Sequence, residues 1–568
     1  MMRHVQTLHT IPLATTGKQV SKDLLQKEEM IVRPQQAKRV LNMRYGITKE
    51  GYRNSFKTFG YLQKYFNDEG NVKMNIFWRS GQAQALAHNG NKYFGGYEVC
   101  ATGIRNFVAA VGIPFYSFDA CFSKHLYYKG VYGNFVTLVD TKPESFTNIP
   151  MAVTTAESEI EPLYTGLFDV SGCNNPDSEL LKRMKEPISC VIGDGSQQFL
   201  NAARTALGQK PIATCSFHVK ENARKKGKQG FNEPRFWKFQ QARSRMERDA
   251  AWATIERTFS PAALNYLRRE IDDDLSAHGR PWTKFAQMQR GICTFGRKGA
   301  NNPVEQLQAK QVPGRHHEPD GFLLCWVESV RDKENVILAA AEKLEGKTLT
   351  PWAERTFQSN SDYMRTCRIG NGDVVPVIYP DADVEVLEPH ENGDQRESRH
   401  HVNLNARTCT CTNWHFNGIA CCHALKVWDV YQSQRNDIPV AEIGPRMREW
   451  AVNSKPWFLA AKFREAAEVL KTERIKLPAD ANLEVDDKLF PPPCLAKLNH
   501  GRNVQEVAAA PPGRPRRRRI IPNRRCGNCN QPGHTKSKCK RQIPWFDWSN
   551  PEHLLFQEAY TRSIPRAV

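Results

Sequence analysis

The chain has 568 residues and a formal net charge of +20. Because this length exceeds what one hydrophobic core can organise, we expect about three to five domains. The positive charge favours a polyanionic partner, above all nucleic acid. No apolar run reaches the length of a membrane span, so we expect no membrane partner.

Residues 1–34 are expected to form a poorly ordered lead, and residues 35–111 to be mainly helical. Within this region Phe59, Leu62 and Phe66 recur at the spacing of a helix with one apolar face. A further helix is expected over Val99–Val111, and from residue 113 the apolar pattern changes to that of strands.

From residue 113 the sequence predicts three strands, a helix, a strand, a second helix and a fifth strand. The expected strands cover residues 113–119, 131–139, 150–155, 188–192 and 211–215. This order suits an α/β sheet of ribonuclease-H type, in which the first and fourth strands lie side by side. The polar, helical residues 219–300 would then be an insertion, and their aromatic residues are expected to pack into its core.

Three carboxylates stand where such a fold would bring them together. Asp119 ends the first strand, Asp194 follows the fourth, and Glu305 lies in a helix start at Asn301-Asn302-Pro303. An Asp after an apolar run is often only a turn residue, and most acids of a chain are solvated surface. The alternative is a pair of metal ions about 3.5–4 Å apart, which activates an attacking oxygen and stabilises a leaving one.

The residues around these acids carry a family resemblance. Phe118-Asp119-Ala120, Gly193-Asp194-Gly195, Cys215-Ser216-Phe217-His218 and Asn302-Pro303-Val304-Glu305 resemble the transposases of the Mutator-like element family. The resemblance implies a ribonuclease-H-like core in which Asp119, Asp194 and Glu305 form the catalytic triad, with two Mg²⁺ ions expected. It also implies a Cys-x-x-His pair at Cys215 and His218, which could be half of a metal site, a DNA contact or packing.

Two further groups of Cys and His have the spacing of zinc ligands. Cys409, Cys411, Cys421 and His423 match the Cys-x-Cys…Cys-x-His pattern of the SWIM zinc finger, with Cys422 expected to pack rather than bind. A set of buried thiols is the alternative.

The second group is a zinc knuckle of the Cys-Cys-His-Cys type at Cys526, Cys529, His534 and Cys539. So short a loop cannot bury a core, so the metal would supply its folding energy. Knuckles commonly bind single-stranded nucleic acid, and protein–protein contact is the alternative. Two structural Zn²⁺ ions are therefore expected, in a reducing compartment.

An arginine run precedes the knuckle. Gly513-Arg514-Pro515 resembles an AT-hook, although Pro512 stands where that motif has Arg. We expect DNA to be bound by Arg514, Arg516, Arg517, Arg518 and Arg519. The same run reads as a nuclear-import signal, which favours a nuclear protein, and a solvated basic linker is the alternative.

These patterns predict a lead (1–34), a helical region (35–111), a catalytic domain (112–320), a helical connector (321–372) and a SWIM region (373–434). A helical tail (435–485), a Pro-rich and Arg-rich linker (486–525), a knuckle (526–539) and a C-terminal tail (540–568) follow.

The resemblance implies an enzyme that cuts element ends and joins them to target DNA, acting on DNA as a monomer or a homo-oligomer. The alternative is a transposase-derived DNA-binding transcriptional regulator that has lost cutting. An RNA-binding protein built on the knuckle and basic tail is a third possibility, but it leaves the region from Asp119 to Glu305 unexplained.

Overall fold

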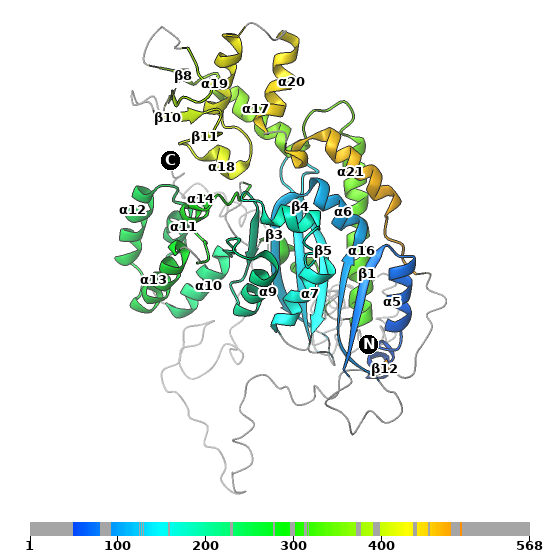
Figure 1. Ribbon diagram of the computed structural model, residues 1–568. Coiled ribbons are helices and arrows are strands. Elements are labelled where there is room, and N and C mark those ends of the chain that lie inside the picture. The colour runs from blue at the N-terminus through cyan, green and yellow to red at the C-terminus, as the bar shows by residue number, and fades with distance from the viewer. Residues whose placement is uncertain are drawn as a thin grey trace, which may run out of the picture. The chain divides into compact units, whose positions relative to one another are not determined.

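The computed structural model (Figure 1) separates Met1–Leu495, the first unit, from Ala496–Val568, and all described residues belong to the first unit. It describes residues 49–79, 92–123, 125, 128, 130–156, 159–227, 231–276, 279–295, 302–311, 315, 317–370, 377–389, 398–435, 440–452, 455–478 and 489–490. The expected lead, arginine run, zinc knuckle and C-terminal tail lie outside these residues. Among the described helices, none is both long and apolar enough to cross a bilayer.

The first unit is built on a mixed sheet with the strand order β1-β2-β5-β4-β3-β6-β7, and β12 pairs with β2. The strands are β1 (Val72–Arg79), β2 (Lys92–Ala101), β3 (Ile113–Phe122), β4 (Val131–Val139), β5 (Thr147–Ala156), β6 (Cys190–Gly193), β7 (Ala213–Thr214) and β12 (Leu489–Phe490). β3, β4 and β5 pair antiparallel, whereas β6 runs parallel to β3 and β7 parallel to β6. The first and fourth expected strands, β3 and β6, therefore lie side by side, as the sequence predicts.

Two layers of helices cover this sheet. They include α7 (Glu161–Val170), α8 (Glu179–Lys185), α9 (Gln197–Leu207), α15 (Asn302–Lys310) and α16 (Pro319–Glu342). α17 (Pro351–Met364) follows α16 along the chain. On one face Phe118 of β3 stacks on Phe168 of α7, with ring centroids 4.8 Å apart. Because side chains alternate along a strand, Asp119 points to the other face. There Val136 of β4 packs with Val304 and Leu307 of α15. The sheet thus directs Asp119 towards the helix that carries Glu305.

The expectation that residues 35–111 are mainly helical is wrong over β1 and β2. The helices of this region are α4 (Lys49–Asn54), α5 (Phe59–Asp68) and α6 (Thr102–Val111). Phe59, Leu62 and Phe66 do form the buried face of α5. In β1, however, Val72 and Met74 are buried and Lys73 between them is exposed, which is the alternation of a strand. β1 and β2 extend the sheet beyond β5.

The insertion is helical, as expected, and has a core of its own. Its helices gather in one group (green in Figure 1): α10 (Ser216–Lys226), α11 (Glu233–Gln241), α12 (Arg245–Glu256), α13 (Pro261–Leu275) and α14 (Lys284–Gln289). The aromatic residues pack together, with the Phe236 and Trp282 rings stacked 5.5 Å apart. Buried Asp274 accepts hydrogen bonds from the backbone N–H groups of Trp282 and Thr283 and from the Thr283 hydroxyl. This carboxylate fixes the loop that closes the insertion.

A second, small sheet follows α17, with the order β11-β10-β9-β8. The C-terminal elements of the first unit are β8 (Arg368–Ile369), β9 (Val384–Glu388), β10 (Ser398–Asn403), β11 (Thr408–Cys409), α18 (Asn413–Asn417), α19 (Cys422–Ser433), α20 (Val440–Ala451), η2 (Pro456–Phe458) and α21 (Ala460–Thr472). The short β segments expected after residue 373 are thus present as β9 and β10. α21 packs against α6, and the ring centroids of Phe463 and Phe107 of α6 lie 5.2 Å apart.

Candidate functional site

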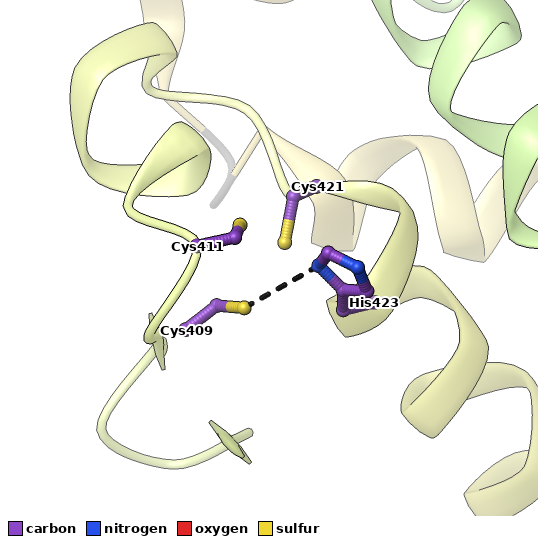
Figure 2. Close-up of side chains that lie close together, drawn as sticks. All are labelled: Cys409, Cys411, Cys421 and His423. Carbon is purple, nitrogen blue, oxygen red and sulfur yellow. Dashed lines mark hydrogen bonds between the residues drawn. The ribbon is translucent and has the colours of Figure 1, made fainter. Parts of the chain in front are cut away.

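Four ligand-type side chains converge where the small sheet meets α19. Cys409 ends β11, Cys411 lies in the turn that follows, Cys421 caps α19, and His423 lies in its first turn. The turn is tight, since Thr412 has φ of +62°. Figure 2 shows the four side chains pointing toward one another. The expected quartet is therefore assembled from two chain segments.

The quartet fits a tetrahedral zinc ion. One candidate ligand atom from each of Cys409, Cys411, Cys421 and His423 lies within 4.8 Å of the other three. Cys409 Sγ and His423 Nδ1 are 3.7 Å apart, close to the edge of about 3.5 Å that Zn–S and Zn–N bonds give in a tetrahedron. Hydrogen bonding to Cys409, and next to Cys421, lowers the pKa of the Cys411 thiol, which favours a thiolate at this position. Hydrogen bonding to Cys411 raises the pKa of Cys409, and hydrogen bonding to Cys409 raises that of Cys421.

A second layer of polar groups orients the histidine. The Nε2 atom of His423 lies 3.2 Å from Oε2 of Glu388, and His400 Nε2 lies 3.0 Å from the same oxygen. A carboxylate on the far ring nitrogen of a ligand His fixes its tautomer and leaves Nδ1 for the metal. Cys422, which was expected to pack, is buried and lies close to Cys367. Glu388, His400 and Cys367 have no ligand spacing in the sequence, so no local pattern predicts them at this site.

The zinc cluster is tied to the insertion. Arg243, which follows α11, donates to the Asn413 side chain at 2.7 Å and to the Cys411 carbonyl at 3.4 Å. Its guanidinium also lies 5.6 Å from the centre of the Phe416 ring. Cys293 donates to the Phe416 carbonyl oxygen, with 3.3 Å between the two atoms. The metal-bearing loop and the helices before Glu305 therefore share direct contacts.

The three carboxylates expected at a catalytic centre lie within electrostatic reach of one another, but among the described residues Asp119 and Asp194 belong to no group of three or more ligand atoms that all lie within 4.8 Å. Asp119 lies near the end of β3 and is 7% exposed, while Asp194 follows β6, the adjacent parallel strand. Burial, and next the charge of Asp194, raise the pKa of Asp119 well above its usual range, and Glu305 adds to this rise. The carboxylates are held locally: the Ala120 N–H donates to Asp119 at 2.9 Å and the Ser196 N–H to Asp194 at 2.9 Å. Their assembly favours cation binding.

Glu305 comes from α15, on the face of the sheet that Asp119 reaches. Burial raises the pKa of Glu305, while His218 and Lys220 oppose the rise. Its Oε1 atom lies 3.9 Å from His218 Nδ1 and 4.0 Å from Cys215 Sγ. The Cys-x-x-His pair therefore lies against the third carboxylate, which sequence spacing alone does not predict.

A fourth carboxylate belongs to this group and was missed from the sequence. Glu159 stands just before α7, and the Tyr164 hydroxyl donates to its Oε1 at 3.0 Å. Burial, and next the charge of Asp194, raise its pKa. Only the sheet brings this residue to the two aspartates, so no local pattern marks it.

Comparison with protein-family models identifies a SWIM zinc finger at residues 400–427. These residues contain all four members of the quartet and His400. A comparison with curated proteins finds no match. The chain therefore contains a SWIM module, and the geometry of its four ligands supports zinc binding by this segment.

Proposed function

We propose that this protein is a DNA transposase of the Mutator-like family that cuts and joins DNA with Mg²⁺ held by Asp119, Asp194 and Glu305. The observation that carries the proposal is electrostatic: the pKa of buried Asp119 is raised by burial, by Asp194 and by Glu305. Asp119 and Glu305, which are 186 positions apart in the chain, therefore interact electrostatically. A SWIM finger follows them at residues 400–427.

The topology supports a ribonuclease-H-like core. Antiparallel β3, β4 and β5 are followed by β6 and β7, which run parallel to β3, in the sheet order β5-β4-β3-β6-β7. Asp119 lies near the carboxyl end of β3, and Asp194 directly follows β6, the adjacent parallel strand. The helical insertion separates Asp194 from Glu305, as the family resemblance implies.

The carboxylates supply hard oxygen ligands, which Mg²⁺ prefers. When bound, two such ions would activate the attacking oxygen and stabilise the leaving oxygen of a DNA phosphodiester. In cutting, a water oxygen attacks phosphorus, the bond from phosphorus to the 3′ oxygen breaks, and a 3′-hydroxyl leaves. In joining, the oxygen of that 3′-hydroxyl attacks the phosphorus of a target phosphodiester, the bond from that phosphorus to the target's own 3′ oxygen breaks, and the target's 3′-hydroxyl leaves with the proton. Asp119 and Asp194 would hold the ions, and Glu305 would complete the set.

The remaining features suit a DNA partner in the nucleus. The net charge of +20 favours phosphate contacts, and the arginines at 514 and 516–519 would supply some of them. The SWIM zinc, and a second zinc at the knuckle, would be structural. Self-association on two element ends is part of the same proposal, since joining needs both ends.

A strand-transfer assay tests the proposal. Purified full-length protein is mixed with Mg²⁺ and a duplex that carries the inverted repeats flanking its gene. We expect cut and joined products with wild type and none with Asp119→Asn or Asp194→Asn, while DNA binding is kept. Asp177→Asn, which changes an exposed acid, is the matched control and keeps full activity.

The assay also separates the competing function. Wild-type protein that binds these ends tightly but never cuts them, with Mg²⁺ or Mn²⁺, would contradict the enzyme and favour a transposase-derived DNA-binding regulator. Loss of binding in both aspartate variants would show that the substitutions had damaged the fold rather than the chemistry.

A further inference from the structure

A second group of metal-type ligands lies at the beginning of α10. Cys215 is the residue that precedes this helix, His218 lies in its first turn, and Glu305 reaches them from α15. Glu305 Oε1 is 4.0 Å from Cys215 Sγ and 3.9 Å from His218 Nδ1. The three atoms all lie within 4.8 Å of one another. His218 and Glu305, which are 87 positions apart in the chain, therefore lie in one group of ligand atoms.

The donor set is one that zinc takes. A thiolate, an imidazole and a carboxylate are all common zinc ligands, and tetrahedral geometry places such atoms about 3.4–3.6 Å apart. The distances here exceed that edge by about half an ångström, a gap that small side-chain rotations close. The SWIM quartet of the same chain shows 3.7 Å between Cys409 and His423. The two groups therefore have similar geometry.

One observation points to a ligand, and a second favours the thiolate that a zinc ion would need. The Nδ1 atom of His218 is buried and makes no hydrogen bond within the described part of the chain. Buried polar atoms are normally satisfied, so an atom left this way beside a thiol and a carboxylate indicates a partner that the protein chain does not supply. Cys215 also stands at the N-terminus of an 11-residue helix, where the helix dipole favours an anion such as a thiolate.

We propose that Cys215, His218 and Glu305 form a third zinc site, with water in the fourth position. Three protein ligands and one open position are typical of zinc sites that are not purely structural. The site uses Oε1 of Glu305, a residue that the proposed function also places at the Mg²⁺ centre. Zinc binding therefore sets the position of a carboxylate that the cutting reaction needs, which couples zinc occupancy to the reaction if the proposed function holds.

Zinc content measures the site directly. Full-length protein is saturated with Zn²⁺, dialysed, and its metal is counted by mass spectrometry against amino-acid analysis. We expect Cys215→Ser and His218→Gln each to hold one zinc ion fewer per chain than wild type. Cys325→Ser, which removes a thiol from α16 outside every ligand group, is the matched control and keeps the wild-type count.

Two controls keep the result decisive. The His218 side chain is 34% exposed, so His218→Gln is expected to fold even if Cys215→Ser does not, and thermal unfolding checks both. Metal-free wild type and Cys215→Ser are also loaded with Co²⁺, and the thiolate-to-cobalt absorption is expected to be weaker in the variant. Equal zinc counts in wild type and folded variants, or equal cobalt absorption, would overturn the proposal. Both readouts work without DNA, so they do not depend on whether the protein cuts.

Discussion

The guanidinium of Arg280 donates a hydrogen bond to the backbone carbonyl oxygen of Gly195, with 3.0 Å between the atoms. Gly195 directly follows Asp194 and has φ of +83°, a conformation that other residues rarely adopt. Arg280 belongs to the insertion, where its Nε atom also pairs with Asp273 at 2.5 Å. One side chain thus joins the insertion to the loop that positions a candidate catalytic aspartate.

Replacing Arg280 is therefore expected to loosen the carboxylate centre. Arg280→Ala removes a hydrogen bond from a charged donor, which costs about 1.5–3 kcal/mol. We expect the unfolding free energy to fall by about this amount and Mg²⁺-dependent cutting to slow at least tenfold, with DNA affinity little changed. Arg268→Ala removes an exposed pair with Glu256 and is the control, with a loss below about 1 kcal/mol. Equal effects from both variants would contradict the coupling.

The raised pKa of Asp119 predicts how stability depends on pH. A carboxyl whose pKa is higher in the folded state stabilises the fold at low pH, and this contribution is lost as pH rises above its ordinary value of 3.8 through the raised one. Asp119→Asn cannot ionise, so we expect this variant to be more stable than wild type at pH 8 without metal, and the difference to shrink at pH 5. Chemical denaturation at both pH values measures it.

We expect Mg²⁺ to make wild type more stable than Asp119→Asn at pH 8, which reverses the order of stability expected without metal. Cations relieve the repulsion among the carboxylates, and a ligand at about 100 times its Kd adds about 2.7 kcal/mol of stability. We expect Mg²⁺ to stabilise wild type more at pH 8 than at pH 5, and to leave Asp119→Asn almost unaffected. A Mg²⁺ effect of the same size in both proteins would place the ion elsewhere.

The sequence predicts those parts of the molecule whose signals are local. The SWIM ligands Cys409, Cys411, Cys421 and His423 could be named because metal ligands recur at short, fixed spacing. The strands that place Asp119 and Asp194 side by side follow from alternating apolar runs and their order. These features need no knowledge of distant contacts.

The rest depends on contacts between distant segments. Glu388 reaches His423 only because β9 lies beside β10 in the small sheet, and nothing around Glu388 marks it as a zinc-site residue. β1 was expected to be helical, but it is an edge strand whose register shifts between Phe77 and Trp78 and whose Phe77 is exposed, so its apolar residues do not alternate regularly. The Cys-x-x-His pair was recognisable, but its meeting with Glu305 depends on how α15 packs on the sheet.

Adjacent cysteines at the start of α19 are expected to behave differently. Cys421 belongs to the zinc quartet, whereas Cys422 lies with Cys367. Cys421→Ser removes a ligand from a buried site, so we expect loss of one zinc ion and more than about 3 kcal/mol of stability. Cys422→Ser changes the next residue, and we expect this variant to keep the zinc and to lose less than half as much unfolding free energy. Metal analysis and thermal unfolding measure both, and zinc loss in the Cys422 variant would show that the quartet is wrongly assigned.

Glu159 is expected to strengthen Mg²⁺ binding at the carboxylate centre. Its pKa is raised by burial and next by the charge of Asp194, so its carboxylate adds negative charge close to that aspartate. Tyr164 donates to one of its oxygens at 3.0 Å and holds the side chain in place. We expect Glu159→Gln to weaken Mg²⁺ binding about tenfold, which corresponds to about 1.4 kcal/mol, as measured by calorimetric titration.

Glu161 supplies the control, because it lies two residues away and its carboxylate accepts from Asn201 at 3.0 Å. Glu161→Gln removes the same charge from the same segment, and we expect it to change Mg²⁺ affinity less than twofold. Tyr164→Phe, which frees the Glu159 carboxylate without removing it, is expected to fall between the two. If Glu159→Gln and Glu161→Gln weaken Mg²⁺ binding equally, then general electrostatics account for the effect and Glu159 has no special place at the centre.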